Sequence, residues 1–257
     1  MKKNFLEFRT NFPYEDAIRF QGLLNQEGYT GLFTFECPET ITLGKATQIE
    51  EDLLVSQEFL NERGTTVLAT DRGGRTTWHG PGQLVGFPIG NLKDLYGDIR
   101  AVKRFSDELL MGLAHACAVM GVKSVETRAQ MPGLWTNKGK LASVGFMLKD
   151  GFLFHGFALN VTQNCVAGMG LINPCGITDC PISYLELEGV RVESMRELAK
   201  KIFPYLPMYK APGAQDAIHA DEESYSALVS KVSRSSMAMD YYSSNIAYSV
   251  SGEMLEQ

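Results

Sequence analysis

A cysteine held between a proline and a glycine is the residue of this sequence best suited to covalent chemistry. Cys175 follows Pro174 and precedes Gly176, so its thiol lies on a turn that is rigid on one side and permissive on the other. A thiol presented on a turn is accessible, as a nucleophile requires, whereas Cys117 lies within an apolar run, as structural cysteines usually do. Cys180, beside a proline, is a weaker competitor. We interpret Cys175 as the candidate nucleophile.

A lysine at the start of a predicted strand is the second reactive group. In the segment NKGKLASVGF, Lys138 and Lys140 flank a glycine, and apolar residues follow Lys140 immediately. We expect Lys138 to be a solvated charge on a turn and Lys140 to enter the sheet. An amine held beside apolar neighbours can act in proton transfer. Together, the cysteine and the lysine predict an acyl-transfer enzyme, although these residues alone do not name its substrate.

A glycine-rich loop, RGGRTTWHGPGQLVGFPI over residues 72–89, is the third feature. Its five glycines let the main chain approach a ligand closely, and successive N–H groups can bind a carbonyl or a phosphate. A tight turn is the plain interpretation, but the large ring of Trp78 beside the titratable His79 favours a functional loop. Neither the phosphate-binding pattern GxxxxGK[ST] nor the dinucleotide pattern GxGxxG occurs.

Hydrophobic periodicity predicts the elements that must position these residues. Helices are expected over residues 13–27, 99–120 and 190–205, the last with Ser194 as its N-cap. Strands are expected within 31–44, 65–70, 82–92 and 122–161, with a hairpin turn at 149–151. This order does not alternate as a doubly wound parallel sheet would. It predicts an α+β domain in which helices pack on one mixed β-sheet.

The character of the chain changes after Pro207. Residues 208–257 are rich in Ser, Ala, Tyr and Met and have little periodicity. We therefore divide the chain into a catalytic domain over residues 1–207 and a Ser-rich C-terminal extension over 208–257, which we expect to be mobile or weakly helical.

Composition excludes several classes of protein. A net charge of −6 argues against nucleic-acid binding, and no stretch approaches the about 18 uncharged apolar residues of a membrane span. The five cysteines are irregularly spaced and include no CxxC pair, which argues against a zinc site and against a disulfide framework. We expect a cytoplasmic protein without a metal.

Four motifs together resemble those of the lipoyl(octanoyl) transferases, the octanoyl-[acyl-carrier-protein]:protein N-octanoyltransferases. The family's RGG-x-x-T-x-HGPGQLV pattern is matched by residues 72–85, its K-[IL]-A-[SA]-[IVL]-G pattern by 140–145, its HG-x-ALNV pattern by 155–161 and its PCGI turn by 174–177. The chain departs from the family in two places. Cys37-Pro38-Glu39 replaces a His-Pro-Pro type segment, and TDCPISYL follows the PCGI turn in place of the usual VTS.

The resemblance implies the biotin/lipoate protein ligase catalytic-domain fold and a two-step transfer without ATP or another cofactor. Cys175 would take the octanoyl group from octanoyl-acyl-carrier protein as a thioester, and Lys140 would activate the thiol and shuttle protons. A lysine of a lipoyl domain would then accept the group; the partners implied are the E2 subunits of 2-oxoacid dehydrogenases and the H protein of glycine cleavage.

The resemblance also implies a set of substrate-binding residues around the acyl group and its carbonyl. They are Arg72, Gly73, Gly74, Arg75, Thr76, Thr77, Trp78, His79, Ser143, Val144, Gly145, Gly156, Phe157 and Ala158, with Gly80 and His155 as further candidates. Because a carrier protein is acidic, basic residues should meet it. The candidates for this contact are Arg72, Arg75, Arg128, Lys138 and Lys140.

Three other functions remain open. An ATP-dependent lipoate–protein ligase would share the fold but would leave Cys175 without a role, and no lysine-rich nucleotide loop is evident. An octanoyl amidotransferase that moves the group between lipoyl-domain proteins would also use a cysteine. A non-catalytic binding module would need neither Cys175 nor Lys140.

Overall fold

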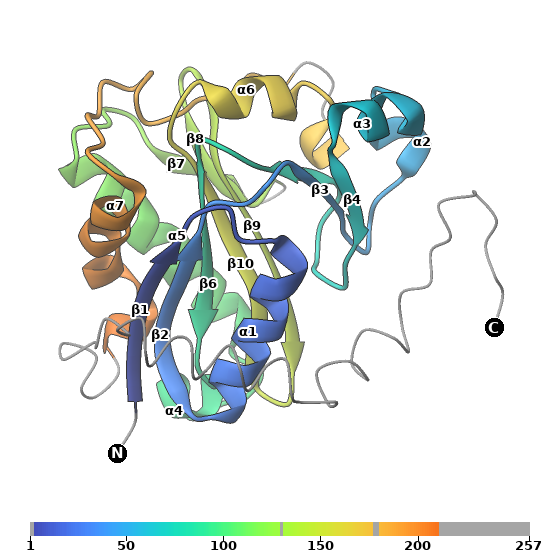
Figure 1. Cartoon of the computed structure of the whole chain (residues 1–257). Coiled ribbons are helices and arrows are strands. Elements are labelled where there is room, and N and C mark those ends of the chain that lie inside the picture. The colour runs from blue at the N-terminus through green and yellow to red at the C-terminus, as the bar shows by residue number, and fades with distance from the viewer. Residues whose placement is uncertain (1–2, 129–130, 177–179, 211–257) are drawn as a thin grey trace, which may run out of the picture.

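A seven-stranded mixed sheet forms the centre of the molecule (Figure 1). A computed structural model describes residues 3–128, 131–176 and 180–210. Within these ranges the strands of the main sheet are β1 (Lys3–Arg9), β2 (Tyr29–Phe35), β6 (Gln83–Ile89), β7 (Glu126–Thr127), β8 (Gly133–Thr136), β9 (Gly139–Lys149) and β10 (Phe152–Asn160). Their order is β1-β2-β6-β10-β9-β8-β7; β1 and β2 run parallel and the other neighbours antiparallel.

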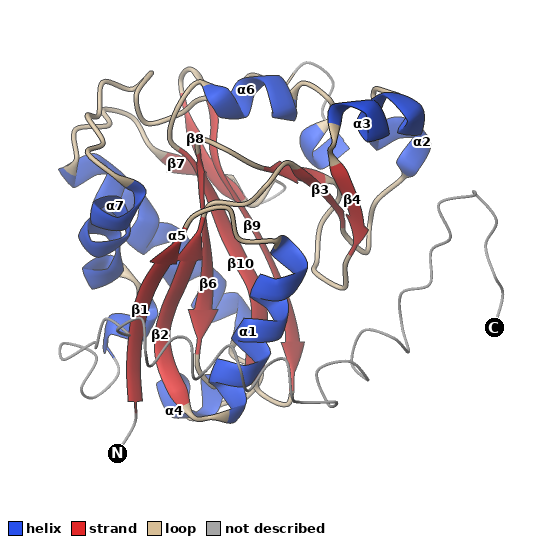
Figure 2. Ribbon diagram, in the orientation of Figure 1, coloured by secondary structure: helices blue, strands red, loops and turns tan. Residues whose placement is uncertain are grey.

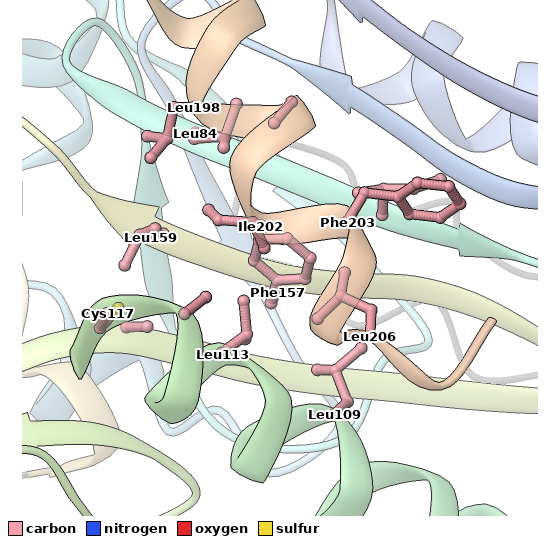
Figure 3. Close-up of a cluster of buried hydrophobic side chains, with 14 of the residues drawn as sticks. Leu84, Leu109, Leu113, Cys117, Phe157, Leu159, Leu198, Ile202, Phe203 and Leu206 are labelled. Carbon is pink, nitrogen blue, oxygen red and sulfur yellow. The ribbon is translucent and has the colours of Figure 1, made fainter. Parts of the chain in front are cut away.

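Helices cover both faces of the main sheet. On one face, α5 (Val102–Val119) and α7 (Met195–Ile202) bury their apolar residues against the strands, and Figure 3 shows Leu113 and Ile202 meeting Phe157 of β10. The apolar side chains of α5 recur every three or four residues, so they form one stripe along the helix. On the other face, α1 (Tyr14–Gln26) packs on a second cluster that is rich in phenylalanine rings.

A smaller three-stranded sheet lies beside the main one (Figure 2). Its strands are β3 (Thr40–Leu43), β4 (Thr66–Ala69) and β5 (Thr77–His79), in the order β4-β3-β5, and the helices around it are α2 (Ile49–Asp52), α3 (Gln57–Arg63) and α6 (Asn164–Met169). A third apolar cluster, which we call the Trp78 core, fills one side of this sheet; its buried members are Ile41, Leu60, Trp78, Cys165, Met169, Leu171 and Ile172.

Most of the predicted elements are confirmed. The helices at 13–27 and 99–120 correspond to α1 and α5, and the hairpin at 149–151 joins β9 to β10. Ser194 caps α7, because its hydroxyl accepts a hydrogen bond from the main-chain N–H of Glu197. The predicted third helix is wrong in length, however: α7 covers only Met195–Ile202 and is followed by the short 3-10 turns η2 (Phe203–Tyr205) and η3 (Pro207–Lys210).

Several short elements were not predicted. They are β1, β5, α2, α3, α4 (Leu92–Tyr96) and α6; of these, β5 lies within the predicted loop. Each of these helices has at most seven residues, too short for helical periodicity to stand out. The mixed α+β class is nevertheless confirmed, since antiparallel and parallel strands share one sheet with helices packed on both faces.

The end of the described chain packs on the α5 face. Met208, in η3, is buried among the apolar residues there, one residue beyond the predicted domain boundary at 207. The remainder of the predicted extension, residues 211–257, lies outside the described residues, so the division into two parts stays a prediction. Among the residues described, no helix is both long and apolar enough to cross a membrane.

Candidate active site

The short helix α2 holds the glycine-rich loop and the cysteine turn together. The buried Asp52 carboxylate accepts hydrogen bonds from Arg75 Nε at 2.9 Å and Thr76 Oγ1 at 3.1 Å. The main-chain oxygen of Asp52 accepts a hydrogen bond from the N–H of Asn173 at 2.9 Å, two residues before Cys175. Although burial opposes ionisation, the hydrogen bonds from Arg75, Thr76 and the main chain keep the pKa of Asp52 below its usual value.

The cysteine turn touches the loop directly at Gly176. Residues Pro174–Gly176 form the 3-10 turn η1, and Gly176 has a φ of 69°, in the left-handed region that favours glycine. A Cβ atom on Gly176 would lie 2.5 Å from Nη1 of Arg75. The main chain beside Cys175 and the Arg75 guanidinium are therefore in contact; the side chain of Cys175 lies outside the described part of the structure.

Lys140 is joined to the chain that follows the cysteine turn. Its N–H donates to the Pro181 oxygen at 2.8 Å, and its own oxygen accepts from the N–H of Ser183 at 3.0 Å. The side chain is buried, and Nζ lies 5.5 Å from the centre of the Trp135 ring. Lys140 thus enters β9 as predicted, whereas Lys138 is an exposed turn residue that donates to the Leu187 oxygen.

The loop also reaches across to β9. The N–H of Gly73 donates to the Phe146 oxygen at 2.9 Å, and a Cβ on Gly145 would lie 3.0 Å from the Gly73 oxygen. Arg72 is buried and anchors the loop to the small sheet, where its Nη2 donates to the main-chain oxygen of Thr42 at 2.6 Å. A side chain at position 145 would therefore crowd the loop main chain.

A line of buried hydrogen bonds runs from the loop to Lys140. His79 Nδ1 lies 2.8 Å from Gln83 Oε1, Gln83 Nε2 donates to Asn160 Oδ1 at 3.0 Å, and Asn160 Nδ2 donates to the Lys140 oxygen at 3.1 Å. Burial lowers the pKa of His79 to about 3, with the Arg72 charge acting in the same direction. His79 is therefore neutral, and its Nδ1–H donates a hydrogen bond to Oε1 of Gln83.

Sequence reasoning missed Asp52, Thr42, Gln83 and Asn160 as supporting residues. Gln83 and Asn160 lie inside two of the matched motifs, GQLV and ALNV, which was the available signal. Asp52 lies in the acidic run IEED, which is typical of a solvated helix face. Its burial depends on Arg75 and Asn173, which are distant in the chain.

Alternation along β5 separates the predicted substrate-binding residues. Thr77 and His79 face the side on which Arg72 lies, since Thr42, opposite Thr77, contacts both His79 and Arg72. The Thr77 hydroxyl is buried and has no hydrogen-bond partner among the described residues. Trp78 points the other way, into the Trp78 core, where its ring contacts Gly80 and Gly168.

The predicted residues on β9 and β10 also divide between the two faces of the sheet. Ser143, Val144 and Gly145 are partly exposed. Val144 and Phe157 pack toward α5, away from the loop. Gly156 is held against β6, because a Cβ there would lie 2.0 Å from the Gly86 oxygen.

The predicted basic contact surface is wrong in two positions. Arg72 and Lys140 are buried, so neither can meet a protein partner at the surface. Arg128 is partly exposed, with its guanidinium 4.3 Å from the centre of the Trp135 ring. It borders an open pocket of about 300 Å³ that is lined by Arg128, Met131, Trp135, Thr136, Asn137, Gly139, Cys180 and Pro181. Over residues 3–128, 131–176 and 180–210, no three His, Cys, Asp or Glu residues gather as a metal site requires.

The fold and the motifs that it brings together are shared with a known family of enzymes. Residues 7–205 match the family described as the lipoyl protein ligase A/B catalytic domain. The octanoyltransferase of Acidobacterium capsulatum is 36% identical over 195 residues, which cover 69% of this chain and 77% of that protein. The octanoyltransferase of Syntrophotalea carbinolica is 34% identical over 204 residues, which cover 77% and 90%. The chain belongs to the octanoyltransferases of this family and is an acyltransferase.

Solved structures agree on the fold. A candidate lipoate protein ligase from T. acidophilum superposes with a TM-score of 0.66 at 11% identity, covering 90% of this chain and 94% of that one. Lipoate-protein ligase A bound with ATP gives a TM-score of 0.62 at 11% identity, covering 90% and 93%. At this identity the likeness concerns the fold alone, and it confirms the predicted ligase-type catalytic fold.

Proposed function

We propose that this chain moves an octanoyl group from octanoyl-acyl-carrier protein to a lysine of a lipoyl domain, through a thioester on Cys175. One observation carries the proposal: the three segments predicted to do the chemistry contact one another. Arg75 of the loop touches Gly176 of the cysteine turn, Gly73 of the loop bonds to β9, and Lys140 at the start of β9 pairs with the chain after the turn. The choice of octanoyl as the acyl group rests on the octanoyltransferase relatives.

The first step is thioester exchange. The Cys175 sulfur attacks the octanoyl carbonyl, a new C–S bond forms, and the bond to the carrier thiol breaks. The proton of the Cys175 thiol passes by way of Lys140 to the departing carrier thiolate. Because one thioester replaces another of nearly equal energy, this step is reversible and needs no ATP.

The second step forms an amide. The amine of the acceptor lysine attacks the octanoyl carbonyl, the C–N bond forms, and the Cys175 sulfur leaves with a proton taken from the amine. An amide is more stable than a thioester, so this step drives the transfer to completion. The same Cys175 and Lys140 are then ready for another cycle.

The acyl carbonyl would lie between the loop and β9. The Thr77 hydroxyl supports this placement, because it is buried beside Arg72 and His79 without a partner among the described residues, and a buried hydroxyl normally has one. Ser143, partly exposed on β9, would form the floor. Donors held in place near a carbonyl stabilise the negative charge that develops on its oxygen during acyl transfer.

The lipoyl-domain acceptors that we propose are those of E2 subunits and of the glycine-cleavage H protein, and the proposed compartment is the cytoplasm. Arg75 and Arg128, which are partly exposed, and the exposed Lys138 are the basic residues left to contact the acidic carrier protein. Each has an acidic neighbour, Glu51, Glu126 and Glu188 respectively, so this contact would exchange one ion pair for another.

The test is a turnover assay with the full chain and a purified lipoyl domain. Octanoyl-acyl-carrier protein as donor should add one octanoyl group to the acceptor without ATP, as read by intact mass. Transfer only from free octanoate with ATP would replace the proposal with a ligase. Transfer only from an octanoylated H protein would replace it with an amidotransferase.

A further inference from the structure

Two buried side chains, Tyr14 and His155, and the partly exposed Asp71 form a polar cluster beside the glycine-rich loop. His155 of β10 is fully buried; its Nδ1 lies 3.1 Å from the Tyr14 hydroxyl of α1, and its Nε2 lies 2.7 Å from Oδ1 of Asp71. We call these three residues the His155 cluster. They are far apart in the chain, and two of them, Tyr14 and Asp71, belong to none of the segments to which the proposed chemistry assigns a role.

The main chain of His155 is held in an unusual conformation. Its φ is 61°, in the left-handed region that few residues other than glycine adopt. The Gln21 side chain of α1 bonds to both sides of this residue: Oε1 accepts from the His155 N–H at 2.8 Å, and Nε2 donates to the His155 oxygen at 3.0 Å. Strain of this kind persists only where the surroundings enforce it, and it often marks a functional position.

The hydrogen bonds of the cluster define the state of each member. Burial raises the pKa of Tyr14, so its hydroxyl keeps its proton and donates to Nδ1 of His155. Burial also lowers the pKa of His155, which leaves the ring neutral with its proton on Nε2. That N–H donates to Asp71. Although burial opposes ionisation of Asp71, the bond from His155 keeps the pKa of its carboxyl below the usual value.

The cluster reaches both ends of residues 72–79, the first part of the loop. Asp71 is the residue immediately before Arg72, where the loop begins. At the other end, the Tyr14 ring stacks on the His79 ring with 4.7 Å between ring centres. Between these two anchors lie Gly73, bonded to Phe146 of β9, and Thr77, with its buried hydroxyl.

We propose that Tyr14, His155 and Asp71 are positioning residues that hold loop residues 72–79 against β9, in the position in which the loop binds the acyl group. None of the three contacts the reacting atoms; they act through the loop. The role in acyl binding rests on the proposed function, but the hold on the loop does not.

The test compares Asp71→Ala with Asp71→Asn. The amide oxygen of the asparagine can still accept the bond from His155 Nε2, so it should rescue what alanine loses. Glu39→Ala is the matched control, because Glu39 is 27% exposed and Asp71 28%, and the Glu39 carboxylate bonds to Arg63 and Thr65, which lie outside the loop. Tyr14→Phe keeps the ring on His79 and removes only the hydroxyl.

Two measurements separate positioning from simple stability. In hydrogen–deuterium exchange of the peptides over 72–79, Asp71→Ala should exchange about tenfold faster than the wild type, while Asp71→Asn and Glu39→Ala should match it. In turnover assays, Asp71→Ala should raise KM for octanoyl-acyl-carrier protein about tenfold and leave kcat nearly unchanged. Tyr14→Phe should show the same pattern to a smaller degree.

The proposal is overturned if Asp71→Ala shows the same exchange rate and the same KM as the wild type. It is also overturned if Asp71→Asn shows increases in exchange rate and KM as large as those of Asp71→Ala. If the exchange pattern appears but the wild type transfers no octanoyl group from the carrier protein, the proposed function fails while the hold on the loop stands.

Discussion

The buried His79 should make the stability of the fold depend on pH, and the structure allows the size of that dependence to be worked out. Replacing His79 by Gln removes the titrating ring. The wild-type ring is 4% exposed, and its pKa is lowered to about 3, mainly by burial and secondarily by the Arg72 charge. In the unfolded chain the same ring has a pKa of about 6.5.

The sign follows from which state binds the proton. Between about pH 3 and pH 6.5 the unfolded chain protonates this ring and the folded chain does not. The free energy of unfolding is therefore highest above that range and decreases as the pH falls through it. From the two pKa values, the free energy of unfolding should fall by about 2 kcal/mol between pH 7.5 and pH 5.0 because of His79 alone. His155 and Asp71 act in the same direction, since the pKa of each is lowered in the fold.

Urea denaturation at pH 7.5 and pH 5.0 measures this loss. His79→Gln should lose about 2 kcal/mol less than the wild type between the two pH values, whatever the variant costs at either one. The matched control is His115→Gln, because His115 lies on α5 against Tyr205, far from the loop. An equal loss in His79→Gln and the wild type would refute the reasoning, since it would mean that the buried ring accepts a proton without cost.

Two further predictions concern substitutions of side chains on β5. Trp78→Ala should lower the free energy of unfolding by about 3–5 kcal/mol, measured by urea denaturation, because the fully buried ring fills the Trp78 core and a cavity would remain. A loss below about 1 kcal/mol would show that the core collapses around the gap. Thr77→Val should leave stability unchanged or raise it by about 1 kcal/mol, since it removes a hydroxyl without a partner among the described residues. The same variant should slow single-turnover acylation about a hundredfold, with Thr77→Ser restoring it; full activity in Thr77→Val would exclude a contact with substrate.

The sequence predicted the parts of the fold that depend on local patterns. The apolar stripe of α5 and the Ser194 cap are both encoded within a few neighbouring residues, and both are confirmed. The strand β1 was missed, because its place comes from parallel pairing with β2, more than twenty residues later in the chain. The helix α3 was missed as well, although Ser56 at its start and Gly64 at its end are usual capping residues.

The sequence likewise predicted only part of the candidate site. Motifs identified the loop, Lys140 and the cysteine turn, but not the residues that bring them together. Asp52 joins the loop to the turn through bonds to residues more than twenty and more than a hundred positions away, and Tyr14 meets His155 across 141 positions. Such contacts arise only after the chain folds, and no spacing pattern in the sequence predicts them.

Cys175 is the residue proposed to carry the acyl group, and the intact mass of the enzyme shows whether it does. The full chain is mixed with octanoyl-acyl-carrier protein in the absence of an acceptor, quenched in acid and weighed, alongside Cys175→Ser and the matched Cys180→Ser. We expect one octanoyl adduct on the wild type and on Cys180→Ser, lost on adding a lipoyl domain, and none on Cys175→Ser. An adduct that persists in Cys175→Ser, or one that disappears only in Cys180→Ser, would contradict this expectation.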